Sequence, residues 1–446
     1  MIQGNLQQAA AITGATLVGQ PLRFSGVATD SRQNCAGRLF MALRGERTDG
    51  EKYVRQAIEN GAVATMVTSA QDVPVPQLLV ADTHQALCAL ARAWQRQVNP
   101  LTVAVTGSNG KTTVKNMLAA ILSRNGKTHA TAGNFNNEIG VPLTILEMPA
   151  ATQMAVIEMG AAQRGDIAAL TQLAPPHVAV VTNVSNAHAG RFGSLEEIAA
   201  GKSEIYHSLG AEGTAVINRD DGFYEFMRQQ AGKAYCLTFG EHADSDVCIL
   251  DRRHCVLRLP GGDILECHLP APGYHNIMNA AAAVAAAWPL SVSLEDMQAG
   301  LEAFEAPAGR LQNRGQVRGV TLLDDSYNAN PASVRAAIDV LAESSRPAWL
   351  VLGDMAELGN ASEAMHREVG EYARQQGIDA LWTVGPQAAR AAAAMGDKGH
   401  AFQDKQTLIT AVQKAWPAQG TVLVKASRSA HMEDVVNALL KQEQPA

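Results

Sequence analysis

Apolar and β-branched residues occur along this chain in short runs that end in polar residues, and helical patterns separate the runs. Early in the chain, apolar runs at residues 39–43, 63–67 and 78–80 predict strands, and the pattern near 53–60 predicts a helix. These elements indicate a small α/β domain over residues 1–81.

The clearest change of pattern lies at residues 103–113. Four apolar or β-branched residues lead into two glycines and a lysine, and the next residues place apolar side chains on one helical face. This order predicts a strand, a tight loop and a helix. The apolar face consists of Val114, Met117, Leu118, Ile121 and Leu122.

Strand and helix patterns then alternate over residues 82–311, as they do in a mostly parallel sheet. Residues 154–158 and 178–183 are apolar runs that end in polar groups, which is typical of central strands covered on both faces. A capping-box pattern predicts a helix over residues 194–209. A strand-rich stretch with a hairpin turn at 260–263 follows, and an alanine-rich helix comes after it.

The pattern restarts after residue 311 and predicts a Rossmann-like domain over residues 312–446. Residues 320–325 form a strand that ends in two acids, and Asn330 and Pro331 supply an N-cap and a first-turn proline to the next helix. No GxGxxG motif occurs here, so NAD is not expected. Further strands are predicted at 349–353, 380–384 and 422–424.

Composition mainly excludes classes of protein. A chain of 446 residues with 47% hydrophobic residues and no polar tract is globular and too long for one core. The net charge of -7 gives no support for nucleic-acid binding. Six cysteines without a CxxC pair, no signal peptide and no apolar run of about 20 residues predict a cytoplasmic protein with reduced thiols and no membrane span.

The loop at residues 107–113 carries the clearest chemistry. Its glycines let backbone N–H groups surround an anion, the helix N-terminus adds partial positive charge, and Lys111 adds a formal one. A nucleotide triphosphate is the expected ligand, with the Thr112 hydroxyl on Mg²⁺. Val105 stands where the common phosphate loop has a glycine, so this loop is a shortened variant. A surface turn with a chance GKT is the alternative. The fold class predicted is therefore α/β with a central P-loop ATPase-like domain between two smaller ones.

Other polar residues allow two interpretations each. Glu158, Asn183 and His188 follow predicted strands and are expected beside the phosphate loop, as a magnesium and phosphoryl-transfer site or as ordinary strand ends. Lys202 lies in the middle of an apolar helical face, and its ammonium either serves a site or extends to water. Asparagines at the start of the alanine-rich helix either cap it or contact a purine, and residues 29–32 form either a plain turn or a ligand loop.

Together the motifs resemble those of the Mur ligase family, the ATP-dependent amide ligases of bacterial cell-wall precursor synthesis. GSNGKTT is typical of the wider superfamily, which includes folate polyglutamate synthetases, whereas DDSYNANP and GDMAELG are typical of the branch that adds D-alanyl-D-alanine. The resemblance covers nearly the whole chain in the same order. Its motifs are DSR at 30–32, LFMAL at 39–43, GSNGKTT at 107–113, GNFNNEIGVPLT at 133–144, IEMG at 157–160, HN..N at 275–279, DDSYNANP at 324–331 and GDMAELG at 353–359.

This resemblance implies ATP and Mg²⁺ as cofactors. It places ATP on the loop residues Gly107, Ser108, Asn109, Gly110, Lys111, Thr112 and Thr113, and on Asn137, Asn276, Asn279, Arg310 and Asp325. The implied metal ligands are Thr112, Glu158, His188 and a carbamylated Lys202, and the catalytic set is Lys111, Glu158, His188 and Lys202. The implied substrate residues are Ser31 and Arg32 for the uridine nucleotide, Asn136 for the muramoyl part, and Asn328, Asn330 and Asp354 for the dipeptide.

The implied reaction joins D-alanyl-D-alanine to UDP-N-acetylmuramoyl-tripeptide through an acyl phosphate, and the partners are these small molecules bound by a monomer. Two stretches depart from the family pattern, namely 425–428, which reads KASR where KGSR is common, and 49–52, which reads DGEK. The rival hypotheses are another Mur-type or folate-type ligase, and a nucleotide-dependent scaffold that shares the fold without the chemistry. The base that takes the proton of the attacking amine is not identified.

Overall fold

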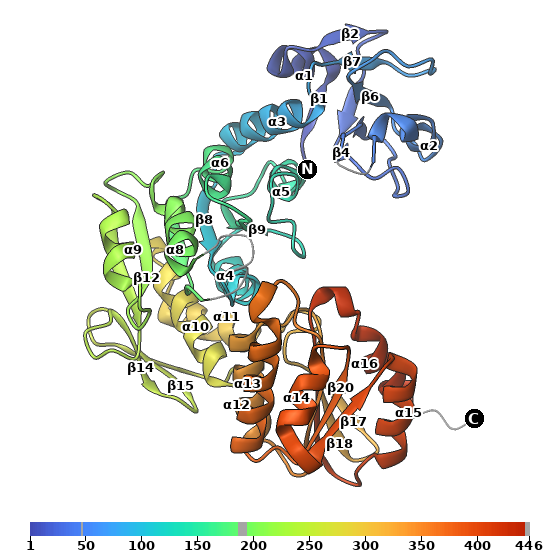
Figure 1. The fold of residues 1–446 in the computed structure, drawn as a ribbon. Helices are drawn as coiled ribbons and strands as arrows, with labels where there is room; N and C mark the ends of the chain where they lie inside the picture. Colours follow the sequence, from blue (N-terminus) through green and yellow to red (C-terminus); the bar gives the residue numbers. More distant parts are fainter. Residues whose placement is uncertain (46–47, 186–193, 442–446) are drawn as a thin grey trace.

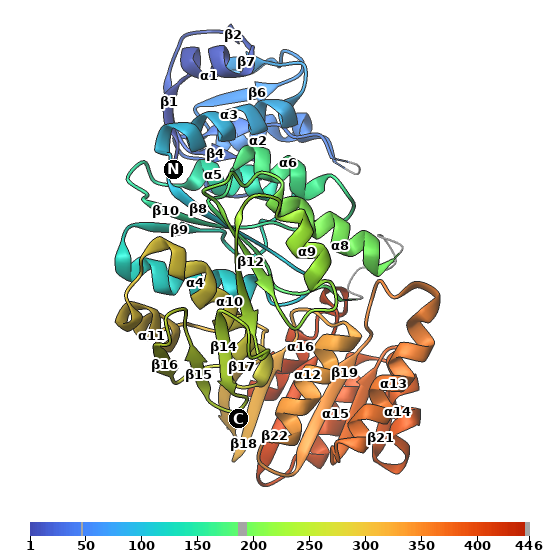
Figure 2. The ribbon, with the colours of Figure 1, turned by 90° about the vertical axis from the view of Figure 1, so that its left-hand side faces the viewer.

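The computed structural model describes residues 1–45, 48–185 and 194–441, and it contains three α/β units in chain order (Figure 1). The N-terminal unit lies at one end, the central unit follows it, and the C-terminal unit lies against the far side of the central one (Figures 1 and 2). The predicted α/β class with three units is confirmed. The borders at residues 81/82 and 311/312 stay predictions.

The N-terminal unit is built on a small sheet of strand order β2-β7-β6-β5-β4, in which only β2 pairs in the antiparallel sense. The strands and the helix expected from the apolar runs are present as β5, β6, β7 and α2. The elements are β1 (Gln3–Asn5), α1 (Leu6–Thr13), β2 (Thr16–Val18), β3 (Arg23–Ser25), β4 (Val27–Ala28), β5 (Leu39–Met41), α2 (Val54–Glu59), β6 (Ala64–Val67), β7 (Gln77–Leu79) and α3 (Thr83–Val98).

The central unit has the strand order β16-β15-β14-β13-β12-β11-β8-β10-β9. All pairs from β9 to β14 are parallel, and β14, β15 and β16 form antiparallel pairs, as the hairpin pattern predicted. Its strands are β8 (Leu101–Thr106), β9 (Thr128–Ala130), β10 (Met154–Glu158), β11 (Val178–Val181), β12 (Thr214–Asn218), β13 (Tyr235–Gly240), β14 (Val247–Asp251), β15 (Cys255–Arg258) and β16 (Ile264–Cys267). Its helices are α4 (Lys111–Asn125), α5 (Gly140–Glu147), α6 (Asp166–Leu173), α8 (Leu195–Ser203), α9 (Tyr224–Gln230), α10 (Tyr274–Ala287) and α11 (Leu294–Glu302).

The C-terminal unit has the strand order β17-β18-β22-β19-β20-β21, parallel except for β17. Asn330 caps α12 and Pro331 is its first residue, as predicted. The strands are β17 (Gln312–Val317), β18 (Val320–Asp325), β19 (Ala348–Gly353), β20 (Ala380–Val384), β21 (Gly399–Phe402) and β22 (Gly420–Lys425). The helices are α12 (Pro331–Ala342), α13 (Ser362–Gln375), α14 (Ala388–Met395), α15 (Lys405–Ala415) and α16 (Glu433–Leu440).

The first two units share a hydrophobic core, whereas the third has its own. One buried cluster joins Leu39 and Met66 of the N-terminal sheet to α3, α5 and the face of the central sheet that carries Ala155. Trp94 of α3 also donates its indole N–H to the Met148 carbonyl oxygen at 2.9 Å. The clusters of the C-terminal unit contain only residues from 311 onward. Among the described residues, the C-terminal unit therefore shares no hydrophobic cluster with the other two units.

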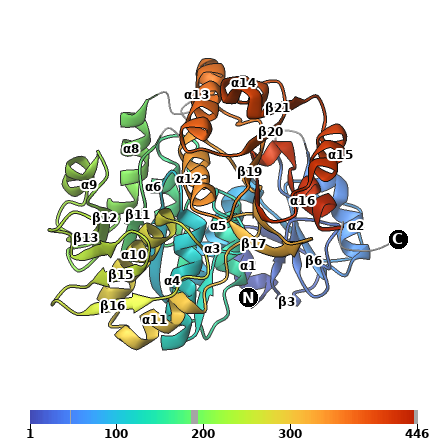
Figure 3. The ribbon, with the colours of Figure 1, turned by 90° about the horizontal axis from the view of Figure 1, so that it is seen from below.

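The helices on the other face of the central sheet hold α4 in place. All five residues of its predicted apolar face are buried in one cluster with α10 and α11. Gly300 of α11 permits this packing, because a Cβ there would lie 2.5 Å from the Ile121 Cα. Seen from below, α12 of the C-terminal unit lies next to α10 (Figure 3).

The helix predicted over residues 194–209 is shorter than expected. Helix α8 ends at Ser203, and a 3₁₀ turn over Glu204–Tyr206 follows. The Ser203 hydroxyl donates to the Ala200 carbonyl oxygen at 2.8 Å, a bond that competes with the helix. The Glu204 carboxylate accepts the backbone N–H groups of Gly165 and Ala168 at 2.7 and 3.2 Å, so it binds the start of α6.

All six cysteines are free, as expected. Within the described ranges, no helix is both long and apolar enough to cross a membrane.

Candidate active site

A cavity of about 840 Å³ lies between the central and C-terminal units. The central unit contributes the loop before α4, the residues after β11 and the first turns of α10, and the C-terminal unit contributes the residues after β18 and β22. The linker at 309–311 lines it as well. The carboxyl ends of the parallel strands β8 and β11 meet here, where ligands bind in open α/β sheets.

The loop between β8 and α4 needs its glycines. Gly110 caps α4 with φ 81°, and a Cβ there would lie 2.3 Å from the Asn279 Oδ1. A Cβ on Gly107 would lie 1.8 Å from the Thr182 Oγ1. The first residues of α4, whose backbone N–H groups have no partner within the helix, line the cavity, and such a helix N-terminus binds phosphate. The alternative of a chance surface turn is wrong, because Ser108, Thr112 and Thr113 are buried.

The residues after β11 fix this loop. The Ser108 backbone N–H donates to the Asn183 carbonyl oxygen at 2.9 Å, and the Asn109 N–H donates to the Asn183 Oδ1 at 3.0 Å. The Asn109 side chain donates to the Ser185 Oγ at 2.9 Å. Asn183 was expected beside the phosphate loop and lies there, whereas Thr182 and Ser185 were not among the predicted site residues. The sequence feature that could have identified Thr182 and Ser185 is the polar end of an apolar strand. That feature does not reveal that β11 pairs directly with β8.

Lys111 begins α4 and is half-buried. Its Nζ donates to the carbonyl oxygens of Gly107 at 2.7 Å and Ser108 at 3.3 Å. Burial lowers the pKa of Lys111, the charge of Glu158 opposes that effect, and the charge of Arg310 adds to it. The Lys111 ammonium and the Arg310 guanidinium are therefore close enough to repel each other, and together they favour an anionic ligand.

Glu158 ends β10 directly beside β8, and its residue is 1% exposed. Its Oε1 accepts a hydrogen bond from the Asn136 Nδ2 at 2.7 Å, and its Oε2 is buried without a partner among the described residues. A buried carboxylate oxygen without a partner is costly, by about 1–3 kcal/mol or more. Such an oxygen fits a divalent cation as its ligand.

Lys202 is 3% exposed, so the interpretation in which its ammonium extends to water is wrong. Burial and the nearby charge of Lys111 hold the pKa of Lys202 well below its ordinary value. His188 lies outside the described residues. Within the described part of the chain, no group of three or more His, Cys, Asp or Glu side chains gathers as a metal site. The candidate metal ligand there is Glu158, because its Oε2 is buried without a partner among the described residues.

Asn276 and Asn279 line the cavity from the start of α10, and neither caps that helix, since its N-cap is Gly273. The Asn276 Nδ2 donates to the Pro272 carbonyl oxygen at 2.8 Å, and the Asn279 Nδ2 donates to the Asn276 Oδ1 at 3.3 Å. His275 beside them has a pKa lowered to about 4, because burial disfavours its charged form and Lys425 repels it. A neutral polar wall of this kind suits a nucleotide base.

The C-terminal unit brings a buried ion pair to the cavity. The Lys425 Nζ lies 2.6 Å from the Asp325 Oδ2 and 3.0 Å from the Asn328 carbonyl oxygen. Burial raises the pKa of Asp325, and Lys425 opposes that effect. Asn330 connects the two units, since its Nδ2 donates to the Asn109 Oδ1 at 2.7 Å.

Ala426 stands where the family pattern commonly has glycine. It has no positive φ and packs against Gly353, so the alanine fits the backbone of this loop without strain.

Several predicted residues do not line the cavity, namely Glu158, Lys202, Asn136, Asn137, Ser31, Arg32 and Asp354. The Ser31 hydroxyl donates to the Gln56 Oε1 at 2.7 Å in the N-terminal unit, and Arg32 pairs with Asp30 at 2.8 Å, which lowers the pKa of Asp30 to about 2. Asp354 does not line the cavity, and its Oδ1 accepts N–H groups at the start of α14, including that of Ala388 at 2.7 Å.

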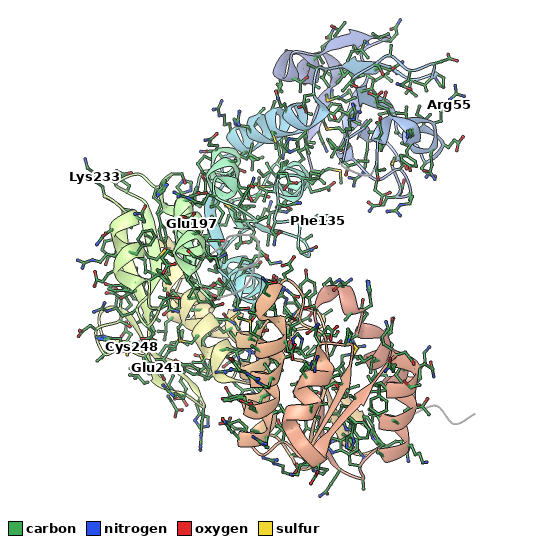
Figure 4. All side chains as sticks on the ribbon, viewed as in Figure 1. Arg55, Phe135, Glu197, Lys233, Glu241 and Cys248 are labelled. Carbon is green, nitrogen blue, oxygen red and sulfur yellow. The ribbon has the colours of Figure 1, made fainter. Side chains whose placement is uncertain are left out.

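Asn136 and Asn137 stand on the loop between β9 and α5. The Asn137 Oδ1 accepts the Gly140 backbone N–H at 2.9 Å, and the residue is exposed. Phe135 beside them is 51% exposed and points to the open side between the outer units (Figure 4). This loop therefore contacts the buried Glu158 through Asn136 and exposes Phe135 beside it.

Three family models match the chain in order. They are the Mur ligase family catalytic domain over residues 23–124, the Mur ligase middle domain over 105–287 and the Mur ligase glutamate ligase domain over 309–428. The Escherichia coli (strain K12) protein named UDP-N-acetylmuramoyl-tripeptide--D-alanyl-D-alanine ligase is 42% identical over 98% of this chain and 99% of its own.

Two solved structures extend this similarity to the whole fold. The structure of MurF from Acinetobacter baumannii is 36% identical, covers 98% of both chains and has a TM-score of 0.89. MurF ligase from Thermotoga maritima in complex with ADP is 28% identical, covers 94% of this chain and 97% of its own, and has a TM-score of 0.81.

Proposed function

The chain belongs to the Mur ligase family, and from that premise we propose that it is an ATP-dependent ligase that joins D-alanyl-D-alanine to UDP-N-acetylmuramoyl-tripeptide. The observation that carries this proposal is the cavity between the units, where a phosphate-binding loop faces a second unit that supplies cations. The full-length similarity to ligases of this name supports the choice of substrates.

ATP and Mg²⁺ are the proposed cofactors. The loop at 107–113 and Arg310 would bind the phosphates, Asn276 and Asn279 the adenine, and Asp325 the ribose. Asn137 would approach the γ-phosphate from the loop before α5. Thr112 and Glu158 would hold one Mg²⁺, and His188 with a carbamylated Lys202 would hold a second. The unpartnered Oε2 of Glu158 supports this assignment, and bound Mg²⁺ would neutralise phosphate charge.

The reaction must make a carboxylate reactive toward an amine. An oxygen of the tripeptide carboxylate attacks the γ-phosphorus of ATP, ADP leaves, and an acyl phosphate forms. The amine of D-alanyl-D-alanine then attacks the acyl carbon, an amide bond forms, the amine loses a proton, and inorganic phosphate leaves. Lys111 and Arg310 stabilise the charge that the transferred phosphoryl group carries in the first step.

The substrates are assigned to opposite ends of the molecule. Ser31 and Arg32 of the N-terminal unit would contact the uridine nucleotide, and Asn136 would contact the muramoyl part. Asn328 and Asn330 would face the dipeptide, since both line the cavity. Asp354 would act on the dipeptide side only indirectly, because its carboxylate binds the start of α14. We also propose a cytoplasmic location, where ATP is available.

Release of phosphate from ATP tests this proposal against its rivals. We expect phosphate only when UDP-N-acetylmuramoyl-tripeptide and D-alanyl-D-alanine are both present, with a pentapeptide product detected by mass spectrometry. Release with a folate or with single amino acids would favour another ligase of the superfamily. Binding of ATP without any release would favour the scaffold.

A further inference from the structure

Tyr327 follows β18 and lines the cavity, and its ring contacts two arginines. The central carbon of the Arg310 guanidinium lies 4.3 Å from the ring centroid, and that of Arg428 lies 5.8 Å from it. Both distances fall within the range of about 6 Å in which a cation over an aromatic ring is attracted to it.

The two arginines differ in their other contacts. Arg428 forms an ion pair with Glu433 at 3.0 Å. Among the residues that the structure describes, no carboxylate forms an ion pair with Arg310, and no hydrogen bond fixes its guanidinium. A free arginine side chain carries about 2 kcal/mol of rotamer entropy. Among the contacts that the described residues make with the Arg310 guanidinium, the Tyr327 ring is therefore the one that restricts its position.

Hydrogen bonds also join the backbone segment that carries Arg310 to the end of β18, which Tyr327 follows. The Tyr327 N–H donates to the Gly309 carbonyl oxygen at 3.0 Å, and the Leu311 N–H donates to the Asp325 Oδ1 at 3.1 Å. These bonds tie both neighbours of Arg310 to the strand end that carries Tyr327. Gly309 has φ 71°, a conformation that a glycine adopts readily.

We propose that Tyr327 is a positioning residue, whose ring holds the Arg310 guanidinium toward the phosphates of the nucleotide before the nucleotide binds. The inference rests on the proposed function, in which Arg310 contacts those phosphates. A pre-positioned guanidinium loses little freedom when it binds phosphate, so the ring contributes to nucleotide affinity. Once phosphate holds Arg310, the ring adds little to the chemical step.

Steady-state kinetics of five variants test this role. Tyr327→Leu is expected to raise KM for ATP about five- to tenfold with kcat changed less than twofold. Tyr327→Phe keeps the ring and is expected to restore the wild-type KM. Arg310→Lys keeps the charge but loses the planar group that stacks on the ring, so it should raise KM for ATP by a similar factor. This variant tests the same contact even if Tyr327→Leu does not fold. Adding Tyr327→Leu to Arg310→Ala should change nothing further.

Tyr372 provides a matched control, since Arg335 lies 5.2 Å from its ring centroid in the same unit but outside the cavity. Tyr372→Leu should leave KM for ATP unchanged. The inference is wrong if Tyr327→Leu or Arg310→Lys keeps the wild-type KM, if Tyr327→Phe is as impaired as Tyr327→Leu, or if the double variant shows additive effects. Failure of the proposed function would look different, because wild-type protein would then release no phosphate with both substrates.

Discussion

Lys202 is the residue whose chemistry depends most on its surroundings. Its side chain is buried and its pKa is well below the ordinary value, because burial and the charge of Lys111 disfavour the ammonium. A neutral amine can add CO₂ and release a proton, which gives a carbamate, a carboxylate on a long arm. That change reverses the sign of the group and makes it a suitable oxygen ligand for Mg²⁺.

We therefore expect ¹³C-bicarbonate to produce a carbamate signal in the NMR spectrum of the native protein and none from this site in Lys202→Ala. Activity should fall when CO₂ is stripped and return with bicarbonate, whereas Lys202→Ala should stay inactive in both conditions. Lys127→Ala, which removes an exposed lysine, is the control and should behave as wild type. An active Lys202→Ala variant would refute both the carbamate and the metal role.

At the scale of elements, the start of α4 is the part that the phosphate site depends on most. Gly110 caps α4 with φ 81°, and Gly165 caps α6 with φ 90°, so alanine at either position meets similar backbone strain of about 1–2 kcal/mol. They differ in their neighbours. A Cβ at Gly110 would lie 2.3 Å from the Asn279 Oδ1, whereas no atom lies within 4 Å of one at Gly165.

Alanine at these two positions separates the effect of backbone strain from the effect of a clash with Asn279. Gly110→Ala should weaken ADP binding by about tenfold or more, because Asn279 must move out of the base pocket. Gly165→Ala should lower the melting temperature by a few degrees and leave ADP affinity unchanged. Calorimetric titration with ADP and a melting curve for each variant measure both effects. Equal loss of affinity in the two variants would show that strain alone matters.

Many helices and strands could be predicted from the sequence, because the buried strands carry continuous apolar runs and several helices carry clear caps. It identified the loop before α4, the apolar face of that helix and the Asn330 cap. It overestimated α8, since the hydroxyl of Ser203 and the carboxylate of Glu204 end that helix through contacts with backbone atoms.

Residues that depend on strand order were harder to find. Asn183 was expected beside the phosphate loop because it ends an apolar strand. Ser185 holds the loop through Asn109 only because β11 pairs with β8, and the local pattern does not contain that pairing. Tyr327 was within a quoted motif, but its contact with Arg310 arises from the path of the linker at 309–311. The roles given to Ser31, Arg32 and Asp354 came from resemblance and stay predictions.

At the scale of the whole molecule, the arrangement of cores predicts which unit moves. The N-terminal and central units share one buried cluster, whereas the C-terminal unit meets the central one around the cavity. The proposed ATP ligands are divided between those two, with Lys111 and Asn279 on one side and Asp325 on the other. A complete site therefore needs both units together.

We expect the C-terminal unit to rotate onto the central one when nucleotide and substrate bind, about a hinge near residues 307–313. Gly309 and Leu311 already have positive φ values of 71° and 48° in this segment. Small-angle scattering should show a smaller radius of gyration with a non-hydrolysable ATP analogue and UDP-N-acetylmuramoyl-tripeptide. Lys111→Ala, which should bind the analogue poorly, is the control. Identical dimensions of the wild type in both states would count against closure.

Transfer of an oxygen isotope tests the central claim most directly. If the tripeptide carboxylate attacks the γ-phosphorus, one of its oxygens leaves with the phosphate when the amide forms. UDP-N-acetylmuramoyl-tripeptide labelled with ¹⁸O in that carboxylate should therefore yield, with ATP and D-alanyl-D-alanine, inorganic phosphate that carries one ¹⁸O per molecule. Phosphate that is formed together with the pentapeptide product but contains no ¹⁸O would contradict an acyl-phosphate ligase.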